Sequence, residues 1–122
     1  MEIKFRFRLK LILDNWGTYK KGDIDTFIIP LLGEQYGLVR FGIDKQWEII
    51  SCDRFIGDTD REGEDIFEND ILIDTENKIG VVEFFNGSFC LKSKGYYVLT
   101  SGFLKNKTKV GNAYDTPEFL QI

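Results

Sequence analysis

Two groups of charged residues have the types and the spacing to take part in chemistry. One is a set of four bases at every second position near the start of the chain. The other is the segment from Asp58 to Asp74, which holds eight acids and only one base. The candidate binding residues taken from these two groups are Lys4, Arg6, Arg8, Lys10, Asp58, Asp60, Glu62 and Asp70.

Each group suits one kind of chemistry. Alternate residues of a strand share one face and lie about 6.5–7 Å apart, close to the phosphate spacing along a single nucleic-acid strand. The four bases therefore suit a nucleic-acid track. Paired carboxylates can act as general acid and base, but this requires an environment that tunes them. We expect the acidic segment to be exposed, which argues against that role.

Other catalytic chemistry is excluded by composition. The chain has no histidine, so it lacks the base of a Ser-His-Asp or Cys-His arrangement and the usual ligand of zinc. Neither phosphate-binding glycine motif is present. Cys52 and Cys90 stand far apart and form no C-x-x-C pair, which is typical of reduced thiols in a cytosolic protein. We expect no enzyme, no cofactor, no metal and no small-molecule substrate.

One stretch of the acidic segment imitates a calcium site. Asp58-Thr59-Asp60-Arg61-Glu62-Gly63 matches the first half of the loop pattern D-x-D-x-[DN]-G. Position twelve of that loop falls on Asn69, where calcium binding requires a bidentate Glu. Both flanks read as strands, whereas the calcium loop lies between helices. We therefore interpret the stretch as a solvated turn with Gly63 at positive φ.

The surrounding elements are mostly strands. Charged and apolar residues alternate from Glu2 to Leu11, the period of a strand with one buried face, so Ile3, Phe5, Phe7, Leu9 and Leu11 are expected to face the core. Asn86-Gly87 predicts a two-residue hairpin loop in which Phe84 faces Phe89, Val82 faces Leu91, and all four lie on one side of the hairpin. Further strands are predicted at 24–32 (an edge strand broken by Pro30), 37–41, 46–52, 70–73, 96–103 and 108–114, with an exposed loop at 58–69 and a short helical turn after Thr116-Pro117-Glu118.

These elements predict a single domain of the mostly-β class. With 122 residues, 43% of them hydrophobic, the chain can form one hydrophobic core. We expect residues 54–122 to form a small SH3-like or partly open β-barrel and residues 1–53 to add strands to it. No apolar stretch resembles a signal peptide or a membrane helix, so a cytoplasmic protein is expected.

Several blocks of the sequence resemble one known family. Phe55-Ile56-Gly57, Asp60, Gly63 and Ile66–Leu72 resemble the signature Y-T-G-L-x-D-x-x-G-x-x-I-Y-E-G-D-I-V of the YopX family of phage and prophage proteins. The chain departs from it at Asp58, where an apolar residue is usual, and at Asn69, which replaces Gly. The further similar blocks are Glu2–Arg6, Gly80–Val82, Gly87–Phe89 and Val110–Leu120. The resemblance implies a β-rich phage-encoded protein in a bacterial cytoplasm, and it implies no particular activity.

Three functions remain open at this point. The first is a protein-binding or assembly module that self-associates into a homo-oligomer. The second is a nucleic-acid-binding accessory protein that uses the basic N-terminal strand, although the low pI of about 4.9 and the absence of aromatics on that face argue against it. An enzyme is the third. In the first case the basic strand pairs with the Asp58–Asp74 segment, in the same chain or in a neighbouring one.

Overall fold

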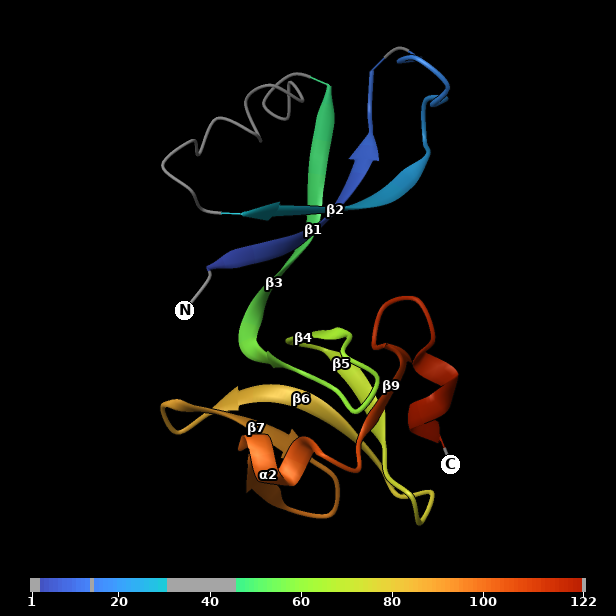
Figure 1. Cartoon of the computed structure of the whole chain (residues 1–122). Coiled ribbons are helices and arrows are strands. Elements are labelled where there is room, and N and C mark those ends of the chain that lie inside the picture. Colours follow the sequence, from blue (N-terminus) through green and yellow to red (C-terminus); the bar gives the residue numbers. More distant parts are fainter. Residues whose placement is uncertain (1–2, 14, 31–45, 122) are drawn as a thin grey trace. The chain divides into compact units, whose positions relative to one another are not determined.

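The computed structural model describes residues 3–13, 15–30 and 46–121, which form two compact units. The first unit is Met1–Arg54 and the second is Phe55–Ile122. Figure 1 shows the strands of both units along the chain. The strand predicted at 37–41 lies outside the described residues. No helix in the described ranges is long and apolar enough to cross a membrane.

The first unit is built around the alternating N-terminal strand. Strand β1 (Lys4–Leu11) pairs antiparallel with β2 (Ile24–Pro30) on one side and with β3 (Trp47–Thr59) on the other. The register of β1 and β3 shifts between Arg8 and Leu9, which marks a β-bulge. Strand β3 continues past Arg54 into the second unit.

Burial in the first unit follows the predicted alternation. Phe7, Leu9 and Leu11 are buried together with Trp47, and Phe5 packs against this cluster. Ile3, which was also predicted to face the core, is 48% exposed because it precedes the first paired residue of β1. The prediction was therefore correct for the paired part of the strand and wrong for Ile3.

The second unit contains six more strands and two short helical segments. They are β4 (Asp65–Phe67), β5 (Asp70–Ile73), β6 (Ile79–Phe85), β7 (Ser88–Lys92), β8 (Tyr96–Val98), α2 (Ser101–Leu104), β9 (Thr108–Asn112) and the 3-10 helix η1 (Pro117–Gln121). Five of the strands form one antiparallel sheet in the order β8-β7-β6-β5-β9, and β4 pairs with the end of β3. The core of this unit consists of Ile66, Leu72, Val82, Leu91 and Leu104.

The β6–β7 hairpin has the predicted register. Phe84 lies opposite Phe89 and Val82 lies opposite Leu91. Asn86 and Gly87 both have positive φ, 51° and 81°, as a type I′ turn requires. Val82 and Leu91 are buried, but Phe84 is 45% exposed. Phe84 is therefore not a core residue, because the hydrophobic core ends before the tip of the hairpin.

Two other predicted elements require correction. Residues 58–69 are not one exposed loop, because β3 runs to Thr59 and β4 begins at Asp65, with Ile66 and Phe67 buried. The strand predicted at 96–103 ends at Val98. Thr100 then caps a short helix, and its side chain accepts a hydrogen bond from the amide of Phe103. The fold is mostly β with two antiparallel sheets, and the SH3-like or partly open barrel stays a prediction.

Candidate functional site

Asp60 is a buried residue that organises the turn between β3 and β4. Its Oδ1 atom accepts hydrogen bonds from the amides of Glu62 and Glu64, at 2.8 and 2.9 Å. Its Oδ2 atom accepts a third, at 2.8 Å, from the amide of Lys109 in β9. Because both oxygens accept hydrogen bonds from backbone N–H groups, this carboxylate holds the turn and β9 together.

Asp70 is a second buried carboxylate with structural contacts. It is fully buried, and its Oδ2 atom accepts a hydrogen bond from the amide of Phe67 at 2.8 Å. The Lys109 ammonium lies 3.5 Å from the same oxygen and donates to the carbonyl of Asp65. The Asp60 and Asp70 carboxylates thus both contact Lys109, through its amide and its ammonium respectively.

The other two predicted acids lie nearer the surface. Asp58 is half-buried, and its Oδ2 atom accepts a hydrogen bond from the Ser101 hydroxyl at 2.7 Å. Glu62 is exposed, and its backbone amide donates to Asp60. In the described ranges, no three carboxylates or thiols form a group that could hold a metal ion. The acidic segment is therefore mainly a structural feature of the second unit.

The four bases of β1 differ in their surroundings. Arg6 is buried and forms an ion pair of 2.8 Å with Asp53 of β3, a residue that precedes the acidic segment. Lys10 is exposed and lies opposite Glu48 of β3. Lys4 and Arg8 are half-buried. The partner of Arg6 thus comes from the neighbouring strand of the same unit.

The sheet face that carries these bases is mixed in character. Strand β2 places Ile28 opposite Arg6 and Ile24 opposite Lys10, and both isoleucines are exposed. Residues directly opposite in an antiparallel pair point to the same face. The face therefore presents isoleucines, bases and acids side by side, and it is not a continuous basic track.

An exposed aromatic surface lies on the second unit, and its position was not located from the sequence. It lies on β6 and β8 of the second unit, and its five large apolar side chains are between 40% and 58% exposed. We call it the aromatic edge, and it consists of Phe84, Phe85, Tyr96, Tyr97 and Val98. Successive strand residues point to opposite faces, so the doublets Phe84-Phe85 and Tyr96-Tyr97 each put one ring on the face away from the core. These doublets are the feature of the sequence from which exposed rings could have been predicted.

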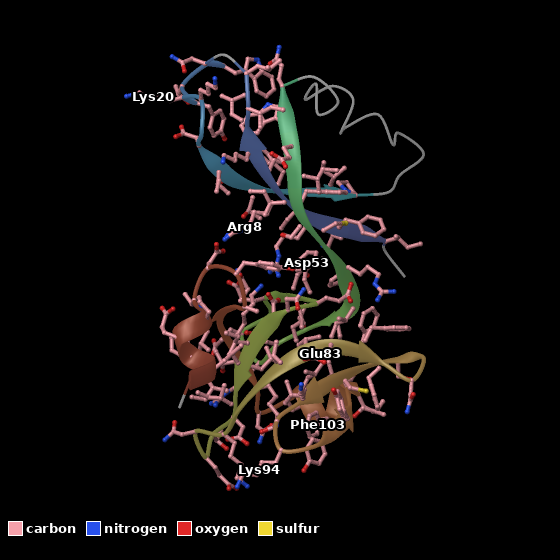
Figure 2. All side chains as sticks on the ribbon, turned by 180° about the vertical axis from the view of Figure 1, so that it is seen from behind. Arg8, Lys20, Asp53, Glu83, Lys94 and Phe103 are labelled. Atoms are coloured by element: carbon pink, nitrogen blue, oxygen red, sulfur yellow. The ribbon has the colours of Figure 1, made fainter. Side chains whose placement is uncertain are left out.

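Ring contacts order this surface. The rings of Phe85 and Tyr96 stack with centroids 3.9 Å apart and an interplanar angle of 10°. Tyr97 stacks on Phe103 of α2 at 6.1 Å, and the Lys107 ammonium lies 4.2 Å from the centroid of the Phe103 ring. Figure 2 labels Phe103 on this unit. The aromatic edge is therefore held in a defined arrangement before any partner binds.

A pocket of about 260 Å³ opens beside the aromatic edge. Its walls are polar and apolar in about equal parts, and Asp58 is the one ionisable residue among those that line it. It is lined by Ile56, Gly57, Asp58, Ser88, Phe89, Val98, Leu99 and Leu104. Val98 belongs to both the pocket and the aromatic edge. The volume suits one side chain of a partner better than a substrate of ordinary size.

The fold and the site together define a class: a mostly-β protein of two compact units, the second of which carries an exposed aromatic surface. The comparisons with known proteins then give the family. The family model described as YopX protein matches residues 34–121, so the chain belongs to the YopX family. The resemblance found in the sequence is confirmed by this match. A search of the curated proteins finds no match.

Proposed function

We propose that this YopX-family chain is a non-enzymatic protein-binding or assembly module and that the aromatic edge is its binding surface. The observation that carries the proposal is the exposure of five large apolar side chains on β6 and on the edge strand β8 of one sheet: Phe84, Phe85, Tyr96, Tyr97 and Val98. Aromatic residues are enriched in protein interfaces, and contiguous exposed apolar patches mark such interfaces. The ring stacking described above lowers the entropy that binding would cost.

The chemistry of the carboxylates supports a non-enzymatic role. The chain has no histidine to act as a base. Asp60 and Asp70, the two buried acids of the acidic segment, accept hydrogen bonds from backbone amides. A carboxylate in such a position stabilises the fold and has little freedom to exchange protons with a substrate. Both cysteines are free thiols, in keeping with a proposed location in the bacterial cytoplasm.

A photo-crosslinking experiment tests the proposed surface. A photoreactive phenylalanine analogue replaces Phe85 in bacterial cells that express the chain, and it replaces Tyr114 as the matched control. Both positions are exposed aromatics of the second unit, at 40% and 47%, but Tyr114 lies outside the aromatic edge. We expect a discrete protein adduct, identified by mass spectrometry, from position 85 alone. The same adducts at both positions, or none at 85, would contradict the proposal.

A further inference from the structure

We infer that the partner of the aromatic edge is a second copy of this chain, and that the two copies join by antiparallel pairing of β8 with β8. The two-fold axis passes through Tyr97. This inference rests on the proposed function, because it names the partner of the same surface. Four features of β8 carry it: its position in the sheet, the direction of its backbone groups, its composition and its register.

Strand β8 is the last strand on one side of the five-stranded sheet. Within the described part of the chain, β8 pairs with β7 and with no other strand. A strand in this position presents a row of backbone N–H and C=O groups that can extend the sheet into another molecule.

The direction of the β8 backbone groups is fixed by its pairing with β7. The amide of Leu99 donates to the carbonyl of Phe89 at 3.0 Å, so the polar groups of Leu99 point toward β7. Successive residues of a strand alternate in this direction, so the groups of Tyr97 also point toward β7. The N–H and C=O groups of Tyr96 and Val98 therefore point to the outer side of the sheet.

The composition of β8 gives this side neither a charged residue nor a proline. Natural edge strands are commonly protected by charged residues or proline. The other described strands that end a sheet each carry a charge: Asp25 in β2, Asp65 in β4 and Lys109 in β9. The residues of β8 are Tyr96, Tyr97 and Val98, which carry neither charge nor proline and are 41–58% exposed.

The register about Tyr97 is self-complementary. In an antiparallel pair with its axis at Tyr97, each Tyr96 lies opposite Val98 of the second copy. These are the two residues whose N–H and C=O groups point outward, so each such pair exchanges two hydrogen bonds. The side chains that meet are apolar. Two residues further out, Lys94 lies opposite Thr100, so no two lysines face each other. The contact is isologous and closes at two copies.

Analytical ultracentrifugation of the full chain tests the interface. We expect the wild type to pass from a monomer of 14.2 kDa to a dimer as its concentration rises through the micromolar range. Val98→Lys places a charge on the pairing edge and should weaken dimerisation at least tenfold. The matched control is Leu120→Lys, because Leu120 is also an exposed aliphatic residue of the second unit, at 42%. It should leave the dimer unchanged.

Disulfide trapping tests the register independently. In a Cys52→Ser background, Tyr97→Cys places two thiols across the two-fold axis at a non-hydrogen-bonded pair, where Cα atoms are about 4.5 Å apart and a disulfide fits. Oxidised glutathione accepts the two electrons and two protons released. Tyr96→Cys is the control, because its thiol faces Val98 of the second copy. We expect a covalent dimer for Tyr97→Cys, formed at least tenfold faster than for Tyr96→Cys.

The outcomes separate this inference from the proposed function. A wild type that stays monomeric, a dimer unaffected by Val98→Lys, or equal trapping at positions 96 and 97 would overturn the β8 pairing. In each of these cases the photoreactive residue at position 85 could still form an adduct with a protein other than this chain. Such an adduct would support the proposed binding surface. If Tyr97→Cys fails to fold, the ultracentrifugation of Val98→Lys decides the question alone.

Discussion

Arg6 and Asp53 lie directly opposite each other on β1 and β3 and form a buried ion pair. The Nε and Nη2 atoms of Arg6 both donate to Oδ2 of Asp53, at 3.0 and 2.8 Å. Figure 2 shows Asp53 on β3. A slip of either strand by one residue would leave both charges buried without this partner, so the pair helps to fix the register of the two strands.

Breaking this pair should destabilise the first unit strongly. Asp53→Ala removes the carboxylate that accepts two hydrogen bonds from the buried Arg6 guanidinium, and we expect a loss of about 3–5 kcal/mol. Because Trp16 and Trp47 both belong to the first unit, tryptophan fluorescence during urea unfolding reports on it. Glu48→Ala, at an exposed position opposite Lys10, is the control and should change stability by less than about 0.5 kcal/mol.

The double variant Arg6→Met/Asp53→Leu separates charge from packing. Apolar residues of similar volume commonly replace a buried ion pair with little or no loss of stability. We expect it to recover most of what Asp53→Ala loses. A double variant as unstable as the single one would contradict the explanation from unpaired charge.

Asp60 should contribute to stability far more than its neighbour Glu62. Asp60→Ala removes the acceptor of three amides, those of Glu62, Glu64 and Lys109, and should cost at least about 2 kcal/mol. Glu62→Ala removes an exposed carboxylate and should cost less than about 0.5 kcal/mol. Urea unfolding followed by far-UV circular dichroism measures both. Similar losses for the two variants would rule out the structural role of Asp60.

Local patterns in the sequence predicted the elements whose stability is local. The alternation in β1 and the Asn86-Gly87 turn each specify an element through adjacent residues, and both are confirmed. The buried part of residues 58–69 was missed in part because one contact of the buried Asp60 carboxylate comes from distant β9. The charge of Asp60, taken alone, predicts an exposed side chain. The partner of Arg6 was likewise set by strand pairing, which no local pattern reveals.

The aromatic edge was missed for a different physical reason. A hydrophobic residue in a strand is read as a core residue, and Phe84 follows the same alternation as buried Val82. The alternation gives the face of the sheet but not the point at which the core ends. Burial at the tip of a hairpin depends on what covers it, and that depends on elements far away in the sequence.

Substitutions in the β6–β7 hairpin should lower the free energy of unfolding more at core positions than near the tip. Leu91→Ala removes a buried side chain and should cost about 2–5 kcal/mol. Phe84 is 45% exposed but contacts the Phe89 ring edge-on at 5.1 Å, so Phe84→Ala should cost only about 1–2 kcal/mol. Chemical unfolding of both variants checks the order. Equal costs would show that Phe84 is a core residue after all.

Asp74 should give the second unit a pH-dependent stability on the acid side. A hydrogen bond from the amide of Lys78 holds the pKa of Asp74 below its ordinary value, and the amide of Glu76 adds to this. The folded state therefore favours the carboxylate. The resulting stabilisation is present above the unfolded pKa and is lost as the pH falls through the folded pKa.

Asp74→Ala should remove this pH dependence. The difference in unfolding free energy between the wild type and Asp74→Ala is expected to be constant at neutral pH and to shrink as the pH falls below about 4. Thr75→Ala, in the same turn, has no titratable group to lose and serves as the control. A difference for Asp74→Ala that stays constant down to about pH 2 would show that its pKa is the same in both states.

The basic strand should not bind nucleic acid tightly. Arg6 is held by Asp53, Lys10 lies opposite Glu48, and the β2 residues opposite Arg6 and Lys10 are isoleucines, so the residues of this face that the structure describes offer no aromatic platform for bases. In fluorescence anisotropy with labelled single- and double-stranded DNA and RNA at about 50 mM salt, we expect no saturable binding below about 10 μM. The decisive variant is Arg8→Gln/Lys10→Gln, which leaves the buried pair intact, and its matched control is Lys20→Gln/Lys21→Gln at two exposed lysines. Tight, salt-sensitive binding that the first variant loses and the second keeps would make nucleic-acid binding the better function, because only contacts on the β1 face could produce that difference.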